Sequence, residues 1–164
     1  MQNFESKNLK YHEITQADTN NLIRWRSNPE TYIYFRNPKP ITRDEHLNWY
    51  NKTYLPNPNR TDFIITEKIT QTPIGFVGVS NQTNTEAEIS YIIGELKFQR
   101  QGFGTEAINA AVQHFSQKGI ITFTAEIHKE NLASIKTIEK CGFIQTDIQC
   151  DFLLYFRPYA LTLK

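Results

Sequence analysis

The feature that most constrains the fold is a change of hydrophobic period at Gly102. Before it, residues 62–67, 74–80 and 87–93 are short segments rich in Ile, Val, Phe and Tyr, separated by polar turn residues. This pattern predicts an antiparallel meander of strands. After it, apolar residues recur at helical spacing until Gly119. The middle of the chain is therefore a strand, a loop and the glycine-rich start of a helix.

Two more helices are predicted upstream of the meander. The first is capped by Thr15 or Asp18 and stops before Pro29, because the residue ahead of a proline avoids the helical conformation. The second begins with capping-box spacing, in which Thr42 is followed three residues later by Glu45. Helices therefore precede the main sheet in the chain.

The C-terminal third alternates strand and helix. Asn131 is placed to cap a helix that ends at Gly142. Further strands are predicted at residues 9–14, 120–127, 143–149 and 152–163. We therefore expect one domain, residues 1–164, of the α/β (mixed α+β) class, with a mostly antiparallel central sheet flanked by helices on both faces.

Composition restricts the partners of the chain. Lys and Arg total 18 and Asp and Glu total 17, so the net charge of +1 favours neither nucleic acid nor a membrane surface. No apolar run approaches the roughly 20 residues that span a bilayer, and the first residues contain no apolar targeting segment. We expect a cytoplasmic protein. The two cysteines and four dispersed histidines predict neither a disulfide framework nor a metal site.

The glycine-rich helix start carries the most specific chemical signal. Unpaired N–H groups and the helix dipole suit a phosphate or pyrophosphate there, and Gly102 and Gly104 let the anion approach the backbone. A simple chain turn is one alternative. Another is the dinucleotide pattern GxGxxG/A, with Glu126 as the acid that binds ribose. That alternative fails on geometry, because Gly94 to Gln101 separate the strand from the first glycine.

Two motifs identify a family resemblance. The segment resembles the cofactor motif [Q/R]-x-x-G-x-[G/A] of the GNAT acetyltransferases, with Gln99, Gly102 and Gly104 in the defining places. Downstream, Asn131-x-x-Ser134 leading into Glu-Lys-Cys-Gly-Phe is similar to the second signature of that family. Two motifs at the family's spacing are far more specific than either one alone.

The opening helices extend the resemblance to nearly the whole chain. Trp25–Glu30 and Glu45–Tyr50 are similar to the branch that contains ribosomal-protein N-terminal acetyltransferases and nucleotide-aminosugar acetyltransferases. The resemblance implies an N-acetyltransferase that moves an acetyl group from acetyl-CoA, without a metal, to a primary amine by direct attack in a ternary complex. A noncatalytic acyl-CoA-binding or sensor module is the alternative, and a homodimer stays open.

The resemblance also implies the cofactor contacts. Backbone N–H groups of residues 100–105 would hold the pyrophosphate, and residues 92–94 would bond the pantetheine. Asn131 would reach the pantetheine arm, cap its helix, or do both. The complete set is Ile92, Ile93, Gly94, Gln99, Arg100, Gln101, Gly102, Phe103, Gly104, Thr105, Asn131 and Ser134.

Acetyl transfer to nitrogen needs a proton acceptor and a donor to the carbonyl oxygen. A strand N–H near Ile92 is the expected donor, because the family's strand is splayed there. Glu88 begins that strand and is the expected base, directly or through water. Glu86 and His128 are weaker candidates for the same role.

The leaving sulfur has no obvious proton donor. Many relatives place a tyrosine on the second helix for this step, but the aligned position here is Ile138, which cannot donate. Ser134, Cys141 or water would have to substitute. A thiol of ordinary pKa, about 8.5, leaves readily enough that activity does not require such a donor.

Aromatic residues crowd the two opening helices, which border the acceptor cleft in this family. Tyr34, Phe35 and Trp49 are the predicted acceptor contacts, because aromatic faces stack on sugars and bases. Arg36 or Arg43 would meet a phosphate or carboxylate. A nucleotide-linked aminosugar, as a small-molecule amine, and a peptide or protein N-terminus remain comparable acceptors.

Overall fold

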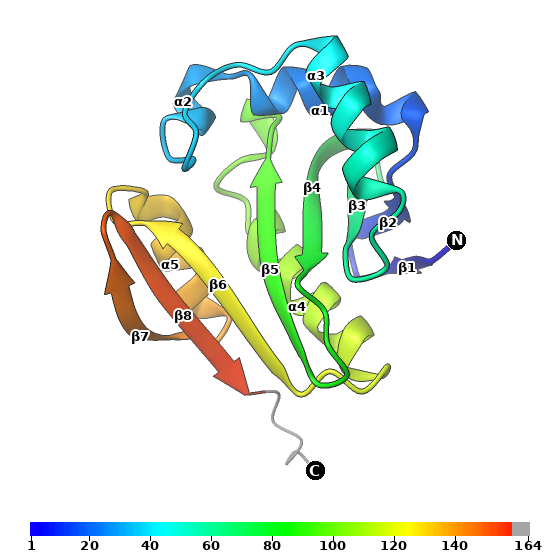
Figure 1. The fold of residues 1–164 in the computed structure, drawn as a ribbon. Helices are drawn as coiled ribbons and strands as arrows, with labels where there is room; N and C mark the ends of the chain where they lie inside the picture. Colours follow the sequence, from blue (N-terminus) through cyan, green and yellow to red (C-terminus); the bar gives the residue numbers. More distant parts are fainter. Residues whose placement is uncertain (159–164) are drawn as a thin grey trace.

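The computed structural model describes residues 1–158 and contains one eight-stranded mixed sheet (Figure 1). The strand order is β1-β2-β3-β4-β5-β6-β8-β7, and every neighbouring pair is antiparallel except β5–β6. The strands are β1 (Asn3–Glu5), β2 (Leu9–Glu13), β3 (Thr61–Glu67), β4 (Thr72–Ser80), β5 (Glu86–Ile93), β6 (Thr122–His128), β7 (Ile144–Gln149) and β8 (Phe152–Pro158). Residues 159–163 of the predicted last strand lie outside the described part.

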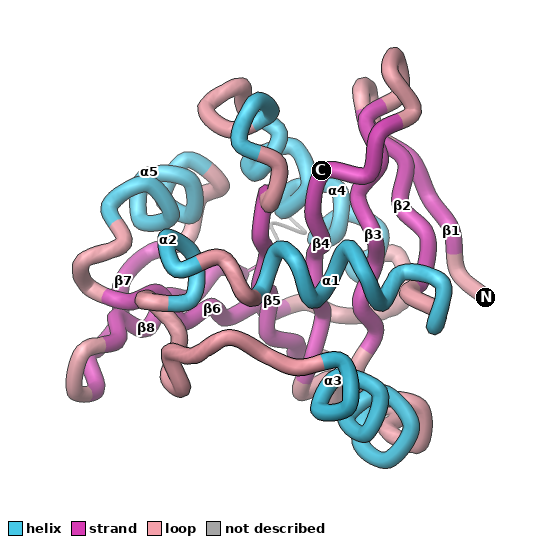
Figure 2. The backbone as a smooth tube through the Cα atoms, turned by 90° about the horizontal axis from the view of Figure 1, so that it is seen from above, coloured by secondary structure: helices cyan, strands magenta, loops and turns pink. Residues whose placement is uncertain are grey.

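Helices cover both faces of the sheet (Figures 1 and 2). On one face are α1 (Thr19–Arg26), α2 (Pro29–Tyr32) and α3 (Arg43–Trp49), which continues as a π-helical turn over Tyr50–Tyr54. On the other face are α4 (Phe103–Ser116) and α5 (Leu132–Lys140). The predicted fold class is confirmed.

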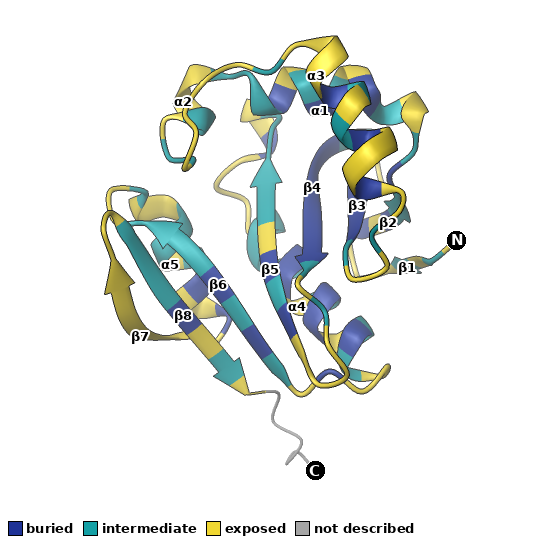
Figure 3. Cartoon of the chain, viewed as in Figure 1, coloured by how far each residue is buried: buried dark blue, intermediate teal, exposed yellow. Residues whose placement is uncertain are grey.

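Each face has its own apolar core, and the darkest colours of Figure 3 follow β3, β4 and the inner side of α4. The larger core packs α4 through Ile108, Val112 and Phe115 against the sheet. The smaller core packs Leu22 and Trp25 of α1 against the opposite face. The two faces can therefore carry different parts of one site, with the sheet as the fixed wall between them.

Side-chain caps set the helix starts as predicted. The Thr15 hydroxyl and the Asp18 carboxylate form a capping box around a 3₁₀ turn that leads into α1. Thr42 and Glu45 form the same reciprocal pair at α3. Asn131 Oδ1 accepts from the N–H of Ser134 at the start of α5.

Two short elements were not predicted. Pro29 does end α1, but it also occupies the first turn of α2, where its missing N–H costs nothing and Asn28 caps the N–H of Glu30. Strand β1, Asn3–Glu5, pairs with β2 although three residues carry too little pattern to be read from sequence.

The only parallel pair opens into a gap. Strands β5 and β6 are paired at Glu86–Glu88 with Thr122–Thr124 and then diverge, while β5 stays paired to β4 as far as Ile93 (Figure 1). We call the region between Ile89–Ile93 and Ala125–His128 the β5–β6 opening. Along this opening, β5 and β6 form no backbone hydrogen bonds with each other. Backbone N–H and C=O groups of both strands therefore face the opening.

Candidate active site

The loop that begins α4 presents a row of free backbone donors. Within residues 1–158, no protein group accepts from the N–H groups of Arg100 through Thr105, and the first bonded N–H is that of Glu106, 3.0 Å from the carbonyl oxygen of Gly102. Arg100 and Gly102 adopt left-handed φ angles of 61° and 84°, which turn these groups outward. The loop has the donor set and the helix dipole that bind a pyrophosphate.

The strand that borders the opening directs alternate N–H groups into it. The Gly94 N–H donates to the carbonyl oxygen of Ile74 on the β4 side, at 2.7 Å. Because successive residues of a strand point in opposite directions, the Ile92 N–H also faces β4. The N–H groups of Tyr91 and Ile93 then face the opening. The donor expected near Ile92 is therefore carried by its two neighbours.

Side chains fix the loop to the strand and to the core. Gln99 Nε2 donates to the carbonyl oxygen of Ile93 at 2.8 Å, so the first motif residue clamps the loop against the opening. Phe103 packs on Phe98 with ring centroids 6.0 Å apart. These two contacts fix the position of the loop that carries the other predicted cofactor residues, including Gln101 and Thr105.

The start of α5 reaches the same opening. Ser134 Oγ accepts from the Tyr91 hydroxyl at 3.2 Å, across the larger core. Ile138 is 1% exposed and fully part of that core. Cys141 is also buried, which raises the pKa of its thiol to about 11. Of the three substitutes for a leaving-group donor, the serine is placed at the opening and the cysteine is not.

Glu88 lies on the face that carries α1 and α3. Its Oε1 accepts from Asn81 Nδ2 at 2.8 Å, which holds the carboxylate in place. The pairing of Glu88 with Thr124 puts Glu126, two residues on, on the same face. The predicted base thus stands where β5 and β6 part.

The segment after α2 crosses to the second half of the sheet. Arg36 forms an ion pair with Glu126, and its guanidinium lies 4.3 Å from the centroid of the Phe152 ring. The Tyr34 ring is 5.7 Å from that of His128. Arg36 is therefore paired with a carboxylate in this structure, and its contact with an acceptor stays a prediction.

A cavity of about 250 Å³ lies between α1 and this segment. Its lining is Arg26, Phe35, Asn37, Lys39, Pro40, Ile41 and Glu45. Burial lowers the pKa of Arg26, and no protein group in residues 1–158 accepts a hydrogen bond from its guanidinium. Trp49 lies behind Arg26, with the guanidinium 5.9 Å from its ring centroid. The cavity thus contains a cation without a protein hydrogen-bond acceptor in residues 1–158, although the charge of Asp62 acts to raise its pKa.

His46 adds a second unsatisfied group near Arg26. It is 1% exposed, and neither ring nitrogen has a hydrogen-bond partner in the described part of the chain. Burial lowers its pKa, and the charges of Arg26 and Arg43 lower it further. Arg43 itself donates to Asn20 Oδ1 at 2.7 Å. Within residues 1–158, Arg43 thus has a hydrogen-bond acceptor and Arg26 has none, while the predicted contact of Arg43 with an acceptor stays untested.

Sequence reasoning missed Arg26, although a signal was present. Leu22, Trp25 and Arg26 follow the spacing i, i+3, i+4 on α1, so the arginine occupies the apolar side of the helix. A charged residue on such a stripe is rarely buried without a partner. An arginine on the apolar side of a helix is therefore the sequence signal that would have marked Arg26 as a candidate for ligand binding.

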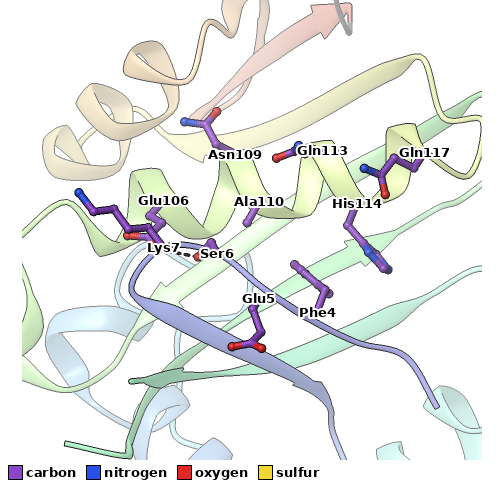
Figure 4. Close-up of a pocket in the computed structure, with 10 residues that line it drawn as sticks. All are labelled: Phe4, Glu5, Ser6, Lys7, Glu106, Asn109, Ala110, Gln113, His114 and Gln117. Atoms are coloured by element: carbon purple, nitrogen blue, oxygen red, sulfur yellow. Dashed lines mark hydrogen bonds between the residues drawn. The ribbon is translucent and has the colours of Figure 1, made fainter. Parts of the chain in front are cut away.

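A larger groove, about 460 Å³, lies between the N-terminal strand and the outer side of α4 (Figure 4). Its groups are mostly engaged with one another: Glu106 accepts from Ser6 and from the N–H of Asn8, and His114 stacks on Phe4. Strand β1 is at the far edge of the sheet from β5 and β6. The groove is therefore separate from the opening.

Within residues 1–158, no three His, Cys, Asp or Glu side chains are grouped so that they could hold a metal ion. No helix in that range is both long and apolar enough to cross a membrane.

Residues 8–144 match the family of acetyltransferase (GNAT) domains. This match covers most of the chain, and the fold has the layers and the β5–β6 opening described above. The chain belongs to the GNAT acetyltransferase family, as its two motifs predicted.

One curated relative aligns with most of the chain, and two solved structures share its fold. An uncharacterised protein of Methanocaldococcus jannaschii is 31% identical over 145 residues, which are 87% of this chain but 29% of that protein. The chain thus spans less than a third of that relative. A crystallised domain from the same organism has a TM-score of 0.83 at 28% identity, over 92% of this chain and 97% of that one. A Vibrio cholerae spermidine N-acetyltransferase in complex with CoA and spermine also reaches 0.83, at 20% identity, over 96% of this chain and 99% of that one.

Proposed function

We propose that this protein is an N-acetyltransferase that transfers the acetyl group of acetyl-CoA directly to a primary amine. The observation that carries the proposal is the row of free N–H groups from Arg100 to Thr105 beside the β5–β6 opening. The loop fits the pyrophosphate, and the N–H groups of Tyr91 and Ile93 fit an extended pantetheine arm. Acetyl-CoA, when bound, supplies the activated acyl group.

The residues around the opening divide the remaining work. A strand N–H of Tyr91 or Ile93 stabilises the carbonyl oxygen as negative charge develops on it. Glu88 takes the proton of the attacking amine, directly or through water, and Asn81 holds its carboxylate. Asn131 and Ser134 border the sulfur side from the start of α5. The two faces of the sheet thus serve the amine and the thiol separately.

The cavity at Arg26 favours an acceptor with an anionic group. The guanidinium of Arg26 is partly buried and has no protein hydrogen-bond acceptor in residues 1–158, and a phosphate would accept from it in bidentate geometry. Phe35 adds an aromatic wall in the same cavity, and Tyr34 lies nearby in sequence. Between the two acceptors left open by the sequence, these contacts support a nucleotide-linked aminosugar over a protein N-terminus.

Two other functions are distinguishable. A noncatalytic acyl-CoA-binding module would bind the same cofactor but would release no thiol in the presence of an amine. A dinucleotide-dependent enzyme would need a doubly wound parallel sheet, whereas six of the seven strand pairs in residues 1–158 are antiparallel and one is parallel. On composition we further propose a cytoplasmic location without nucleic-acid or membrane partners.

Thermal unfolding with acetyl-CoA, and with NAD as the control, tests the cofactor assignment. Ligand at about one hundred times its dissociation constant should stabilise the protein by about 2.7 kcal/mol. Release of CoA thiol should then require an amine, and among matched amines those that carry a phosphate should give the higher kcat/KM. No stabilisation by acetyl-CoA would contradict the proposal, and binding without thiol release would favour the noncatalytic module.

A further inference from the structure

A glycine occupies the middle of the buried strand β4, on the face of the sheet that carries α1 and α3. Gly78 lies between Val77 and Val79, whose side chains belong to the larger core on the other face. Because successive strand residues point to opposite faces, position 78 points toward α1 and α3. A glycine inside a strand packs no side chain and often marks a place where another group approaches the backbone.

Two oxygen atoms from the neighbouring strands converge above Gly78. The strand register places Asp62 of β3 on one side of it and Ser90 of β5 on the other. A Cβ built on Gly78 would lie 2.8 Å from Asp62 Oδ1 and 2.9 Å from Ser90 Oγ. A side chain at position 78 would push these oxygens away. The glycine therefore allows a carboxylate and a hydroxyl to face the same small space.

Ser90 is the open side of this space. It is exposed although it lies inside β5, and within residues 1–158 its hydroxyl is bonded to no protein group. The adjacent Ile89 and Tyr91 pack in or against the larger core on the other face. Glu88, the expected base, is two residues from Ser90 and therefore on the same face. The Ser90 hydroxyl is thus available to an acceptor whose amine lies at Glu88.

Asp62 is the buried side of the same space. Its side chain is 4% exposed, and Arg60 holds it with Nε 3.0 Å from Oδ1 and Nη2 2.9 Å from Oδ2. A carboxylate oxygen accepts more than one hydrogen bond, so Oδ1 can still accept from a group above Gly78. The ion pair with Arg60 keeps this carboxylate in a fixed place.

The charges around Asp62 determine which donor fits. Burial lowers the pKa of Arg26, Arg60 lowers it further, and Asp62 raises it, so the three charges lie near one another. One carboxylate therefore faces two guanidinium groups. This excess of positive charge repels a second ammonium group on the acceptor. A neutral hydroxyl is not repelled, and it can both donate to Asp62 and accept from Ser90.

We infer that Ser90 and Asp62, brought together across Gly78, form a subsite for a hydroxyl group near the reacting amine of the acceptor. This inference rests on the proposed acetyltransferase function and narrows its acceptor to a hydroxyl-bearing amine rather than a polyamine. Two residues along a strand span roughly 6.7 Å, so the hydroxyl lies on a carbon close to the one that carries the amine. Ser90, Asp62 and Gly78 then determine specificity and take no part in proton transfer.

A pair of amines that differ in one hydroxyl tests the subsite. Cyclohexylamine and trans-2-aminocyclohexanol are the probes, and release of CoA thiol is measured for the wild-type protein and for Ser90→Ala, Asp62→Asn and Gly78→Ala. We expect the wild-type protein to prefer the amino alcohol about tenfold in kcat/KM, and each variant to lose most of this preference. The ratio of the two kcat/KM values removes any effect that is common to both amines.

Ser116→Ala is the matched control and should keep the preference, because its hydroxyl lies on α4 and has no partner within residues 1–158. Ser90→Ala removes an exposed hydroxyl and should fold even where a change at the buried Asp62 does not. Calorimetric titration of both amines into protein saturated with CoA measures the same preference without turnover. No preference in the wild-type protein, or an unchanged preference in Ser90→Ala, would overturn the inference. If neither amine releases thiol, the calorimetric preference still decides it, whereas failure to bind acetyl-CoA would overturn the proposed function.

Discussion

Gly104 and Tyr91 are in direct contact across the start of α4, since a Cβ at residue 104 would lie 2.9 Å from Cε2 of the tyrosine. The third motif glycine therefore gives room to a ring as well as to a phosphate. Gly102 is different. No atom lies within 4 Å of a Cβ built there, and its φ of 84° is the constraint. The two motif glycines are thus required for separate physical reasons.

Replacing Gly104 with Val should displace the Tyr91 ring. Overpacking of this kind costs about 1–3 kcal/mol in unfolding free energy, and the loop that binds acetyl-CoA should shift with the ring. Gly102→Ala should cost about 1 kcal/mol through backbone strain alone. Chemical denaturation and acetyl-CoA titration of both variants check this. Equal and small changes in unfolding free energy and in acetyl-CoA binding for both variants would contradict the contact between residue 104 and Tyr91.

Glu88→Gln should lower kcat by about 100-fold at neutral pH, because the amide cannot take the proton of the amine. The KM for acetyl-CoA should stay unchanged, since Glu88 lies on the opposite face from the cofactor loop. Glu86→Gln, on the same strand and fully exposed, is the comparison. Steady-state kinetics at saturating acetyl-CoA measure kcat for both variants. A larger loss of kcat in Glu86→Gln than in Glu88→Gln would indicate that Glu86 is the base.

Arg26→Met should raise the KM for a phosphate-bearing acceptor about tenfold or more, with little effect on amines that lack an anion. It should change stability little, because the desolvation of Arg26 and its repulsion from Arg60 oppose its attraction to Asp62, which keeps Arg60 as a partner. Arg43→Met is the matched control, since that side chain is exposed and bonded to Asn20. Kinetics with acceptors that differ only in a phosphate measure the first effect, and urea unfolding measures the second. Loss of the preference for phosphate in Arg43→Met would contradict the role proposed for Arg26.

Stability should fall between about pH 7 and pH 5, partly through His46. Burial and two arginines lower its pKa in the folded state, so the unfolded chain takes up protons first as the pH falls through its unfolded value of about 6.5. His114, whose pKa burial also lowers, acts in the same direction. His46→Leu should therefore flatten the pH dependence of unfolding free energy without abolishing it. A slope identical to that of the wild-type protein would contradict this.

Local chemistry made much of the fold predictable. Thr42 with Glu45, and Asn131, each satisfy backbone groups of a helix start within a few residues, so their effect is visible in the sequence. The strand segments were equally clear, because every buried strand of the meander is rich in Ile, Val and Phe. The single-domain organisation stays a prediction, since the chain spans 29% of one relative.

The details of the site depend on distant contacts and were less predictable. Which N–H near Ile92 faces the opening depends on the register between β5 and β4, and no residue type encodes that register. Arg36 pairs with Glu126 across 90 positions of sequence, a contact that no local pattern encodes. The roles predicted for the cofactor residues and for Glu88 stay predictions until the experiments above are done.

The opening between β5 and β6 also bears on how this protein avoids aggregation. Unpaired strand edges usually template contacts between chains, and proteins protect them with charges, prolines or bulges. Here the two edges face each other inside one sheet, joined at Glu86–Glu88 and backed by α4 and α5. A second chain cannot lie alongside either edge without entering the gap. The protein therefore keeps the free backbone groups of the opening inside the sheet, while β1 and β7 form its outer edges.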